Sequence, residues 1–275
     1  GIAQVGKSFR NEITPGNFVF RTLEFEQMEM EFFVAPDDAQ QWHEHWLKER
    51  LDWYVRLGIR PDHLKLRPHH ADELSHYSSA TSDVEYLYPI GWSELEGIAN
   101  RGNFDLTQHA QHSGEKLEYF DTASGERYVP HVIEPAAGVG RTVLAVLCDA
   151  YDEEEVAGEQ RTLLRLHPRL APIKVAVLPL VRKDGQPELA HEVFQALRGQ
   201  VQAEYDEGGS IGKRYRRQDE IGTPFCVTID HQSLEDHTVT VRDRDSLAQQ
   251  RVAIDELPAV LGARLVAPWQ TPKLG

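Results

Sequence analysis

The sequence predicts an α+β first part with antiparallel strands and helices, followed by a small α/β part with a mixed sheet. Residues 7–34 alternate in polarity on both sides of a turn signal at residues 14–17, which indicates a long antiparallel hairpin. Residues 128–151 pass from an apolar strand through small residues into an apolar helix. Beyond residue 171, apolar strands alternate with helical patterns, as is typical of an α/β domain.

Length and composition indicate a globular protein. The 275 residues can form two ordinary domains, and hydrophobic and charged fractions of 40% and 27% are unlike those of a disordered chain. No apolar run approaches the length of a membrane span, and the first residues lack the pattern of a secretory signal. We therefore expect a cytoplasmic protein with no membrane partner. Cys148 and Cys226 lie in separate apolar runs, so we expect reduced core thiols and no structural zinc.

Negative charge is concentrated in the first part of the chain. The net charge is −15, but residues 171–275 hold 13 Lys and Arg against 15 Asp and Glu, a net charge of −2. Residues 1–170 therefore carry the remaining −13. A polyanion such as RNA would meet the second part more readily than the first.

The predicted hairpin places chemically active side chains on one face. Because strand residues alternate between faces, Arg10 and Glu12 share a face of the first strand. Four residues share a face of the second strand: Phe25, Gln27, Glu29 and Glu31. A guanidinium suits a phosphate, an aromatic ring suits a nucleobase, and a carboxylate suits an amine. The set indicates a site for a nucleotide and an ammonium group, and the alternative is a solvated face of ion pairs.

Residues 36–58 predict a helix, because Pro and Asp begin it, Gly58 ends it, and apolar residues recur at three and four positions. We expect this apolar stripe to pack in the core: Trp42, Trp46, Leu47, Leu51 and Tyr54. Residues 59–77 suggest a second short helical region.

Residues 82–90 predict a strand. If the strand pattern continues in the following segment, Glu94 and Glu96 face one side. Residues 109–128 are interpreted as a polar loop or hairpin.

A strand and a helix meet within residues 128–151. We expect the strand to end at Glu134 and Pro135, a loop of small residues to follow, and the helix to begin near Arg141. Small residues let the backbone approach a nucleotide closely, and the N–H groups at a helix N-terminus point toward anions.

The chain changes character after this helix. Residues 152–160 are a charge run, interpreted as a solvated linker or helix end, and we expect a domain boundary within residues 161–170. Four elements are predicted beyond it: strands at 174–181, 224–230 and 237–244, and a helix at 187–205.

A basic cluster precedes the second of these strands: Lys213, Arg214, Arg216 and Arg217. With Tyr215 among them, these residues suit contacts with an RNA backbone and stacking on a base. The alternative is a solvated helix start balanced by nearby carboxylates.

Four stretches resemble one protein family. FRNE and FRTLEFEQMEMEFF resemble motif 2 of the class II aminoacyl-tRNA synthetases, in the wording of the glycyl-tRNA synthetases. GWSELEGIANR resembles the family's segment between motifs 2 and 3, and EPAAGVGR resembles motif 3. GSIGKRYRRQDEIGTPFCVTID resembles the class IIa anticodon-binding domain. The sequence departs from the family at Ala136, where serine is common, and at Gly140, where an acidic residue is common.

The resemblance implies a partial class II catalytic domain, an antiparallel sheet with helices, at residues 1–160 and an α/β anticodon-binding domain at 171–275. No motif 1 is visible before the hairpin, so we expect the chain to be the C-terminal part of a longer, homodimeric protein. The implied activity is that of a glycine–tRNA ligase, which activates glycine to glycyl-adenylate with ATP and transfers it to the 3′ end of tRNA(Gly). We expect these residues alone to have weak or no activity.

The resemblance also implies roles for individual residues. Arg10, Glu12 and Arg141 would be catalytic, binding the α-phosphate, the adenine amino group and the γ-phosphate of ATP. Glu94 would bind Mg²⁺. The implied ATP site comprises Arg10, Asn11, Glu12, Phe20, Arg21, Thr22, Leu23, Glu24, Phe25, Glu94, Leu95, Gly138, Val139, Gly140 and Arg141. The implied glycine site comprises Phe25, Glu26, Gln27, Met28, Glu29, Glu134, Pro135, Ala136, Ala137 and Gly138, and the implied tRNA contacts are the four residues of the basic cluster.

Two other functions stay open at this point. A synthetase-like RNA-binding or polymerase-accessory module could keep the fold without catalysis, although it would not need the phosphate-binding arginines. A histidyl-, threonyl- or prolyl-specific relative is the third possibility. The carboxylate-rich stretches EFEQMEME and ELEGIANR favour the glycyl type.

Overall fold

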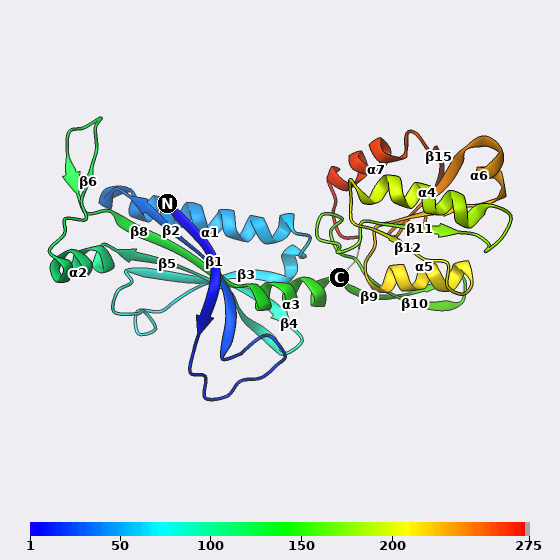
Figure 1. The fold of residues 1–275 in the computed structure, drawn as a ribbon. Helices are drawn as coiled ribbons and strands as arrows, with labels where there is room; N and C mark the ends of the chain where they lie inside the picture. Colours follow the sequence, from blue (N-terminus) through cyan, green and yellow to red (C-terminus); the bar gives the residue numbers. More distant parts are fainter. Residues whose placement is uncertain (273–275) are drawn as a thin grey trace. The chain divides into compact units, whose positions relative to one another are not determined.

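The computed structural model describes residues 1–272 and divides the chain into two compact units, residues 1–148 and the residues from 149 onward (Figure 1). Each unit has its own hydrophobic core. None of the helices formed by the described residues combines the length and apolar character that a membrane-spanning segment needs.

The first unit is built on a six-stranded sheet in the order β1-β2-β8-β5-β4-β3. The strands are β1 (Ile2–Phe9), β2 (Glu24–Val34), β3 (Leu64–Pro68), β4 (Ala80–Tyr88), β5 (Gly91–Gly102) and β8 (His131–Gly138). Every neighbouring pair is antiparallel. The predicted hairpin is confirmed as β1 and β2, but residues 10–23 form a loop, so both strands are shorter than their alternating patterns.

Helix α1 (Ala39–Arg56) covers one face of this sheet (Figure 1). It follows a 3-10 turn, η1 (Pro36–Asp38), since proline suits the first turn of a helix. The predicted apolar stripe is confirmed as core packing, with Tyr54 buried and four partly buried partners: Trp42, Trp46, Leu47 and Leu51. Ile98 and Ile133 contribute to the same core from the sheet.

The remaining elements of the first unit come after β5 and β8 in the chain. Helix α2 (Phe104–Ser113) follows β5, and a small hairpin of β6 (Tyr119–Phe120) and β7 (Arg127–Tyr128) leads to β8. The hairpin predicted within residues 109–128 is therefore confirmed, although its first residues belong to α2. Helix α3 (Val139–Ala150) ends the series.

The second unit holds a five-stranded mixed sheet in the order β12-β11-β13-β14-β15. Its strands are β11 (Val175–Pro179), β12 (Ala203–Tyr205), β13 (Phe225–Ile229), β14 (Thr238–Asp243) and β15 (Gln249–Ala253), and its helices are α4 (Gln186–Arg198), α5 (Ile211–Glu220), α6 (His231–Asp236) and α7 (Leu257–Val266). The first three strands are parallel and the last two antiparallel to their neighbours, which confirms the predicted mixed sheet. α4 and α7 pack on one face of the sheet and α5 packs on the other (Figure 1).

Three sequence predictions are wrong because strand pairing decides the structure of these segments. After one 3-10 turn, η2 (Pro61–His63), residues 59–77 form β3, which pairs with β4, and not a second helical region. The small residues after Glu134 stay in β8, and α3 begins at Val139 without the predicted loop. Residues 152–160 lie in a hairpin of β9 (Tyr151–Val156) and β10 (Glu159–Leu164), not in a solvated linker.

A buried network of ion pairs joins this hairpin to the mixed sheet. Asp219 of α5 is 1% exposed and accepts hydrogen bonds from Arg161 of β10 at 2.8 Å and Arg242 of β14 at 2.9 Å. Arg161 also pairs with Glu154 of β9. The acidic run is therefore balanced by arginines of the facing strand and of the core.

We predict that Asp219→Ala strongly destabilises the second unit, because it leaves the buried guanidinium of Arg242 without its carboxylate and removes one of the two carboxylates that pair with Arg161. Removing one partner of a buried pair costs about 3–5 kcal/mol. Amide hydrogen exchange in β13 and β14 measures the loss. Arg216→Ala is the matched control, since its pair with Glu159 lies at the surface and is worth less than about 1 kcal/mol. Equal losses for the two variants would contradict this account.

Candidate functional site

A cleft of about 340 Å³ lies on the face of the first sheet opposite α1. Alternate residues of the two central strands form its floor: Gly97 and Ala99 of β5, and Ala136 and Gly138 of β8. The residues between them, such as Ile98, point into the core beneath α1. Because the floor residues have no side chain beyond Cβ, the cleft is open where a sheet is ordinarily covered.

The strand register places acidic groups on both sides of this floor. Ala136 pairs with Glu29 of β2 on one side and with Gly97 on the other. Gly97 in turn pairs with Asp83 of β4. Two carboxylates thus flank two positions that lack extended side chains.

One end of the cleft carries arginines and aromatic rings. The guanidinium of Arg10 lies over the Phe25 ring, with Cζ 5.4 Å from the ring centroid. Arg141 lies over Phe20 at 4.5 Å and donates a hydrogen bond from Nε to the Phe20 carbonyl oxygen at 2.9 Å. Its Nη1 also lies 3.2 Å from a carboxylate oxygen of Glu94. Two guanidinium groups and two rings therefore line the same end, which suits a nucleoside phosphate.

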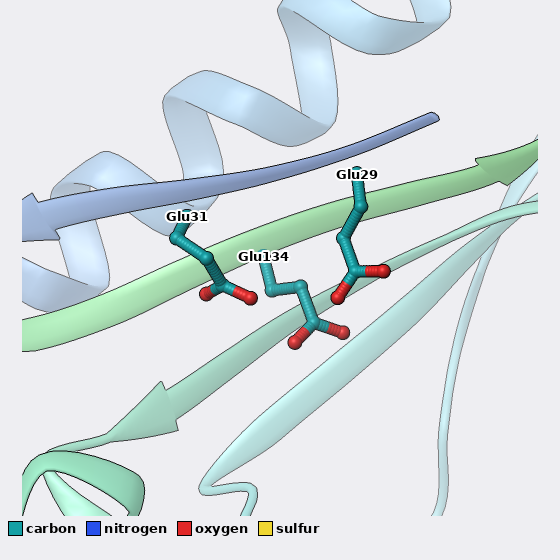
Figure 2. A group of neighbouring side chains, drawn as sticks. All are labelled: Glu29, Glu31 and Glu134. Carbon is teal, nitrogen blue, oxygen red and sulfur yellow. The ribbon is translucent and has the colours of Figure 1, made fainter. Parts of the chain in front are cut away.

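Three carboxylates gather beside the floor (Figure 2). Glu29 and Glu31 come from β2 and Glu134 comes from β8, and one oxygen of each lies within 4.8 Å of the others. Burial, together with the negative charge of Glu134, raises the pKa of Glu31 to about 7. Burial also raises the pKa of Glu134, although Arg101 opposes this effect. The arrangement attracts a cationic group, and carboxylate oxygens could also bind a metal ion.

Arg101 fixes one member of this carboxylate group. It donates hydrogen bonds to Glu134 at 2.6 Å and to Asp105 of α2 at 2.7 Å. The ring of Tyr77 lies beside its guanidinium, 4.1 Å from Cζ. Arg101 therefore positions Glu134, and its charge is already neutralised by two carboxylates.

Glu94 and Glu96 face opposite sides of the sheet, so the prediction that they share a side is wrong. The pairing of β5 with β4 shifts register and skips Leu95. An extra residue of this kind, a β-bulge, reverses the alternation of the strand. Glu96 consequently points toward α1, where it accepts hydrogen bonds from Arg50 and Tyr54, both at 2.7 Å. Glu94 lines the cleft.

The structure brings together most of the predicted site. From the implied ATP site, the cleft is lined by Arg10, Glu12, Phe20, Arg21, Thr22, Phe25, Glu94, Leu95, Gly138, Gly140 and Arg141, whereas Asn11, Leu23, Glu24 and Val139 are not among its lining residues. From the implied glycine site it is lined by Phe25, Gln27, Glu134, Ala136 and Gly138, and Glu29 lines an adjoining hollow. Strand alternation turns the others to the opposite face: Glu26, Met28, Pro135 and Ala137.

One wall of the cleft was not predicted. It consists of residues from β3, β4 and the segment between them: Arg67, His69, Glu73, Ser75, Tyr77, Thr81 and Asp83. The strand predicted at 82–90 covers part of this wall, but the signal for β3 is only a short alternation of apolar and charged residues in 64–67. Four residues are too few to distinguish a strand from a helical turn.

The basic cluster lies on α5, and its members differ in exposure. Arg214 is 1% exposed and donates hydrogen bonds to backbone carbonyls at the end of β11. Arg216 and Arg217 each form an ion pair with a carboxylate. Lys213 is exposed. The charge that α5 presents at the surface is therefore smaller than its sequence suggests.

Both units are similar to parts of the same known proteins. Residues 174–264 match the family model of an anticodon binding domain. Over 96% of its length the chain is 57% identical to the glycine–tRNA ligase of Caldanaerobacter subterraneus subsp. tengcongensis and spans 57% of that protein. Over 97% of its length it is 55% identical to the glycine–tRNA ligase of Streptomyces coelicolor and spans 60% of it.

A solved structure has the same fold. The prolyl-tRNA synthetase from Cryptosporidium parvum, complexed with L-proline and AMP, matches with a TM-score of 0.69 at 18% identity, over 96% of this chain and 55% of that chain. The antiparallel sheet with its cleft and the mixed sheet that follows therefore have the fold of a class II aminoacyl-tRNA synthetase. Within that class, the chain is homologous to the glycine–tRNA ligases, and it spans little more than half the length of these curated relatives.

We predict that the stability of the first unit falls as pH rises from about 4.5 to about 7. The folded-state pKa of Glu31 is raised from 4.5 to about 7, so in this window the folded protein binds more protons than the unfolded protein. Glu31→Gln should match the wild type in thermal melts near the lower limit and exceed it above the upper limit. Glu26→Gln on the opposite face is the control and should show no such gain. A wild-type advantage at high pH would contradict the prediction.

Proposed function

We propose that the protein to which this chain belongs is a glycine–tRNA ligase, which activates glycine with ATP and transfers the glycyl group to tRNA(Gly). One observation carries the proposal: a single cleft and its adjoining hollow hold two guanidinium groups suited to phosphates, an aromatic ring and carboxylates suited to an amine. These groups belong to Arg10, Arg141, Phe25, Glu29 and Glu134.

The arginine end of the cleft would bind ATP. Arg10 would bind the α-phosphate and Arg141 the γ-phosphate, with the adenine ring stacked on Phe25 and its amino group at Glu12. The glycine carboxylate oxygen then attacks the α-phosphorus, and the bond to pyrophosphate breaks. The protein contributes alignment and charge neutralisation, so no covalent intermediate with a side chain is required.

Glu94 fits one oxygen ligand of Mg²⁺. Its carboxylate is about half exposed at the arginine end and pairs with Arg141, so it lies where the phosphates would be. Mg²⁺ is commonly held by one or two carboxylates together with substrate phosphates. When bound, the ion would neutralise charge on the phosphates.

The carboxylate side of the cleft would bind the ammonium group of glycine. Glu29 and Glu134 would pair with it, while Arg101 holds Glu134 in place. Glycine has no side chain that a pocket can grip, and one methylene changes pocket binding by only about 1–3 kcal/mol. The affinity for glycine would therefore come from the carboxylates that bind its ammonium group. Larger amino acids would be excluded because the space beside the floor is too small for their side chains.

The second unit would bind tRNA(Gly). The match to an anticodon binding domain and the low net charge of this part of the chain support this assignment. Lys213, Arg216 and Arg217 are the members of the basic cluster that a phosphate backbone could reach, because Arg214 is buried. We further propose, from the family resemblance, that the full-length protein is a cytoplasmic homodimer.

We predict that the full-length protein catalyses ATP–pyrophosphate exchange that depends on glycine and not on alanine or serine. Arg10→Ala should lower the rate about 10²- to 10³-fold, because it removes a cationic group from the phosphate site. Exchange is measured by incorporation of labelled pyrophosphate into ATP. Absence of exchange with every amino acid, in a protein that still binds RNA, would instead support a non-catalytic module.

We predict that Glu29→Gln raises the glycine concentration required for exchange about 10- to 100-fold, since a charge-assisted hydrogen bond contributes about 1.5–3 kcal/mol. The KM for ATP should change little, because Glu29 lies on the amine side of the cleft. Glu26→Gln is the control, because Glu26 lies on the opposite face of β2. An unchanged glycine requirement would reject the assignment of Glu29.

A further inference from the structure

The cleft has a wall to which neither ATP nor glycine has been assigned. The arginine end accounts for the nucleotide, and the carboxylates of β2 and β8 account for the amine. The opposite wall comes from β3, β4 and the segment between them, and it contains His69, Thr81 and Asp83. The second half-reaction brings a third reactant into the cleft, the terminal ribose of tRNA.

His69 is oriented by an acidic partner on this wall. Its Nε2 lies 2.9 Å from a carboxylate oxygen of Asp83, which is 5% exposed. Its backbone N–H donates to the Thr81 carbonyl at 2.9 Å, which extends the β3–β4 pairing by one step. When Nε2–H is donated to Asp83, the lone pair of the imidazole lies on Nδ1. A carboxylate that holds one nitrogen of an imidazole prepares the other to accept a proton.

The charged groups around His69 are mostly negative. Arg67 is 3.4 Å from its Nε2, but the Arg67 guanidinium is shared among three carboxylates, at 2.9 to 3.0 Å. These are Glu73 of the connecting segment and Asp83 and Glu85 of β4. Lys65 of β3 also pairs with Glu85, at 2.9 Å, so three carboxylates lie with two cationic side chains on this wall. That excess of negative charge would attract a positive charge formed on the imidazole during transfer.

The sheet register relates this wall to the glycine site. Asp83, Gly97, Ala136 and Glu29 lie in one row across four adjacent strands. Neighbouring strands are about 4.8 Å apart, so Asp83 and Glu29 are separated by roughly 14 Å. The two positions between them leave the floor clear. A glycyl-adenylate with its ammonium at Glu29 would place its carbonyl over that floor, facing the wall of His69.

We propose that this wall receives the 3′-terminal ribose of tRNA and that His69 accepts its proton during transfer; the inference rests on the proposed function. The ribose hydroxyl oxygen forms a bond to the glycyl carbonyl carbon. The bond from that carbon to the phosphate oxygen breaks, and its electron pair leaves with AMP. The hydroxyl proton passes to Nδ1 of His69, which later releases it to water, while Asp83 holds the imidazolium.

The test separates the two half-reactions in the full-length protein. His69→Gln should leave glycine-dependent ATP–pyrophosphate exchange within about twofold of wild type. It should slow single-turnover transfer from preformed glycyl-adenylate to tRNA about 10²-fold, the effect typical of a general base. His70→Gln is the matched control, because His70 is exposed and does not line the cleft, and both rates should be unchanged. Wild-type transfer should rise with pH, and His69→Gln should lose that dependence.

The outcomes distinguish this inference from the proposed function. Unchanged transfer in His69→Gln, or equal losses in exchange and transfer, would overturn it, because the residue would then be dispensable or structural. Asp83→Asn is a second test, because asparagine has nearly the same shape as aspartate but no negative charge. If the inference holds, this variant transfers glycine more slowly and keeps its exchange activity. A wild-type protein without glycine-dependent exchange would overturn the proposed function itself.

Discussion

The antiparallel register of the six-stranded sheet is the constraint on which the cleft depends. It aligns Glu29, Ala136, Gly97 and Asp83 across four strands, so two positions without extended side chains lie between two acidic ones. Strand alternation does the rest, because the residues next to the floor, such as Ile98, must then face the core beneath α1. A shift of any central strand by one residue would fill the cleft with core side chains.

Because of the bulge at Leu95, β5 places Glu96 on the face beneath α1 and Glu94 on the face of the cleft. Glu96 is 1% exposed, and its carboxylate is held by Arg50 and Tyr54, so it attaches α1 to the sheet. A buried carboxylate is tolerated only when its oxygens are satisfied in this way. Without the extra residue, Glu94 would point to the same side and would compete for these donors. The bulge instead delivers it to the cleft beside Arg141.

The sequence predicted those elements whose structure depends on residues close together in the chain. The alternating hairpin, the helix that begins after Pro36, the mixed sheet and most of the arginine end of the cleft follow from periodicity, from proline and glycine signals and from the family resemblance. Residues 64–68 could not be assigned because so short an alternation does not distinguish a strand from a helical turn, and residues 152–160 because their run of carboxylates hides a tight hairpin. The orientation of Glu94 depended on a bulge, and the burial of Arg214 depended on carbonyls supplied by another strand. The unpredicted wall of the cleft includes Arg67 of this missed strand, β3, and the segment that follows it.

Under the function proposed above, the group of three carboxylates would explain how the site selects a substrate that offers few groups to bind. Glu29, Glu31 and Glu134 repel one another, and the raised pKa of Glu31 is one sign of that repulsion added to burial. Arg101 relieves only part of it, since it also pairs with Asp105. A proton or a cation must supply the remainder. An incoming ammonium group would replace a proton there and would gain the attraction of carboxylates already held in place. Recognition of the smallest amino acid can thus rest on charge that the fold has concentrated in advance, while the strands beside it limit the space for any side chain.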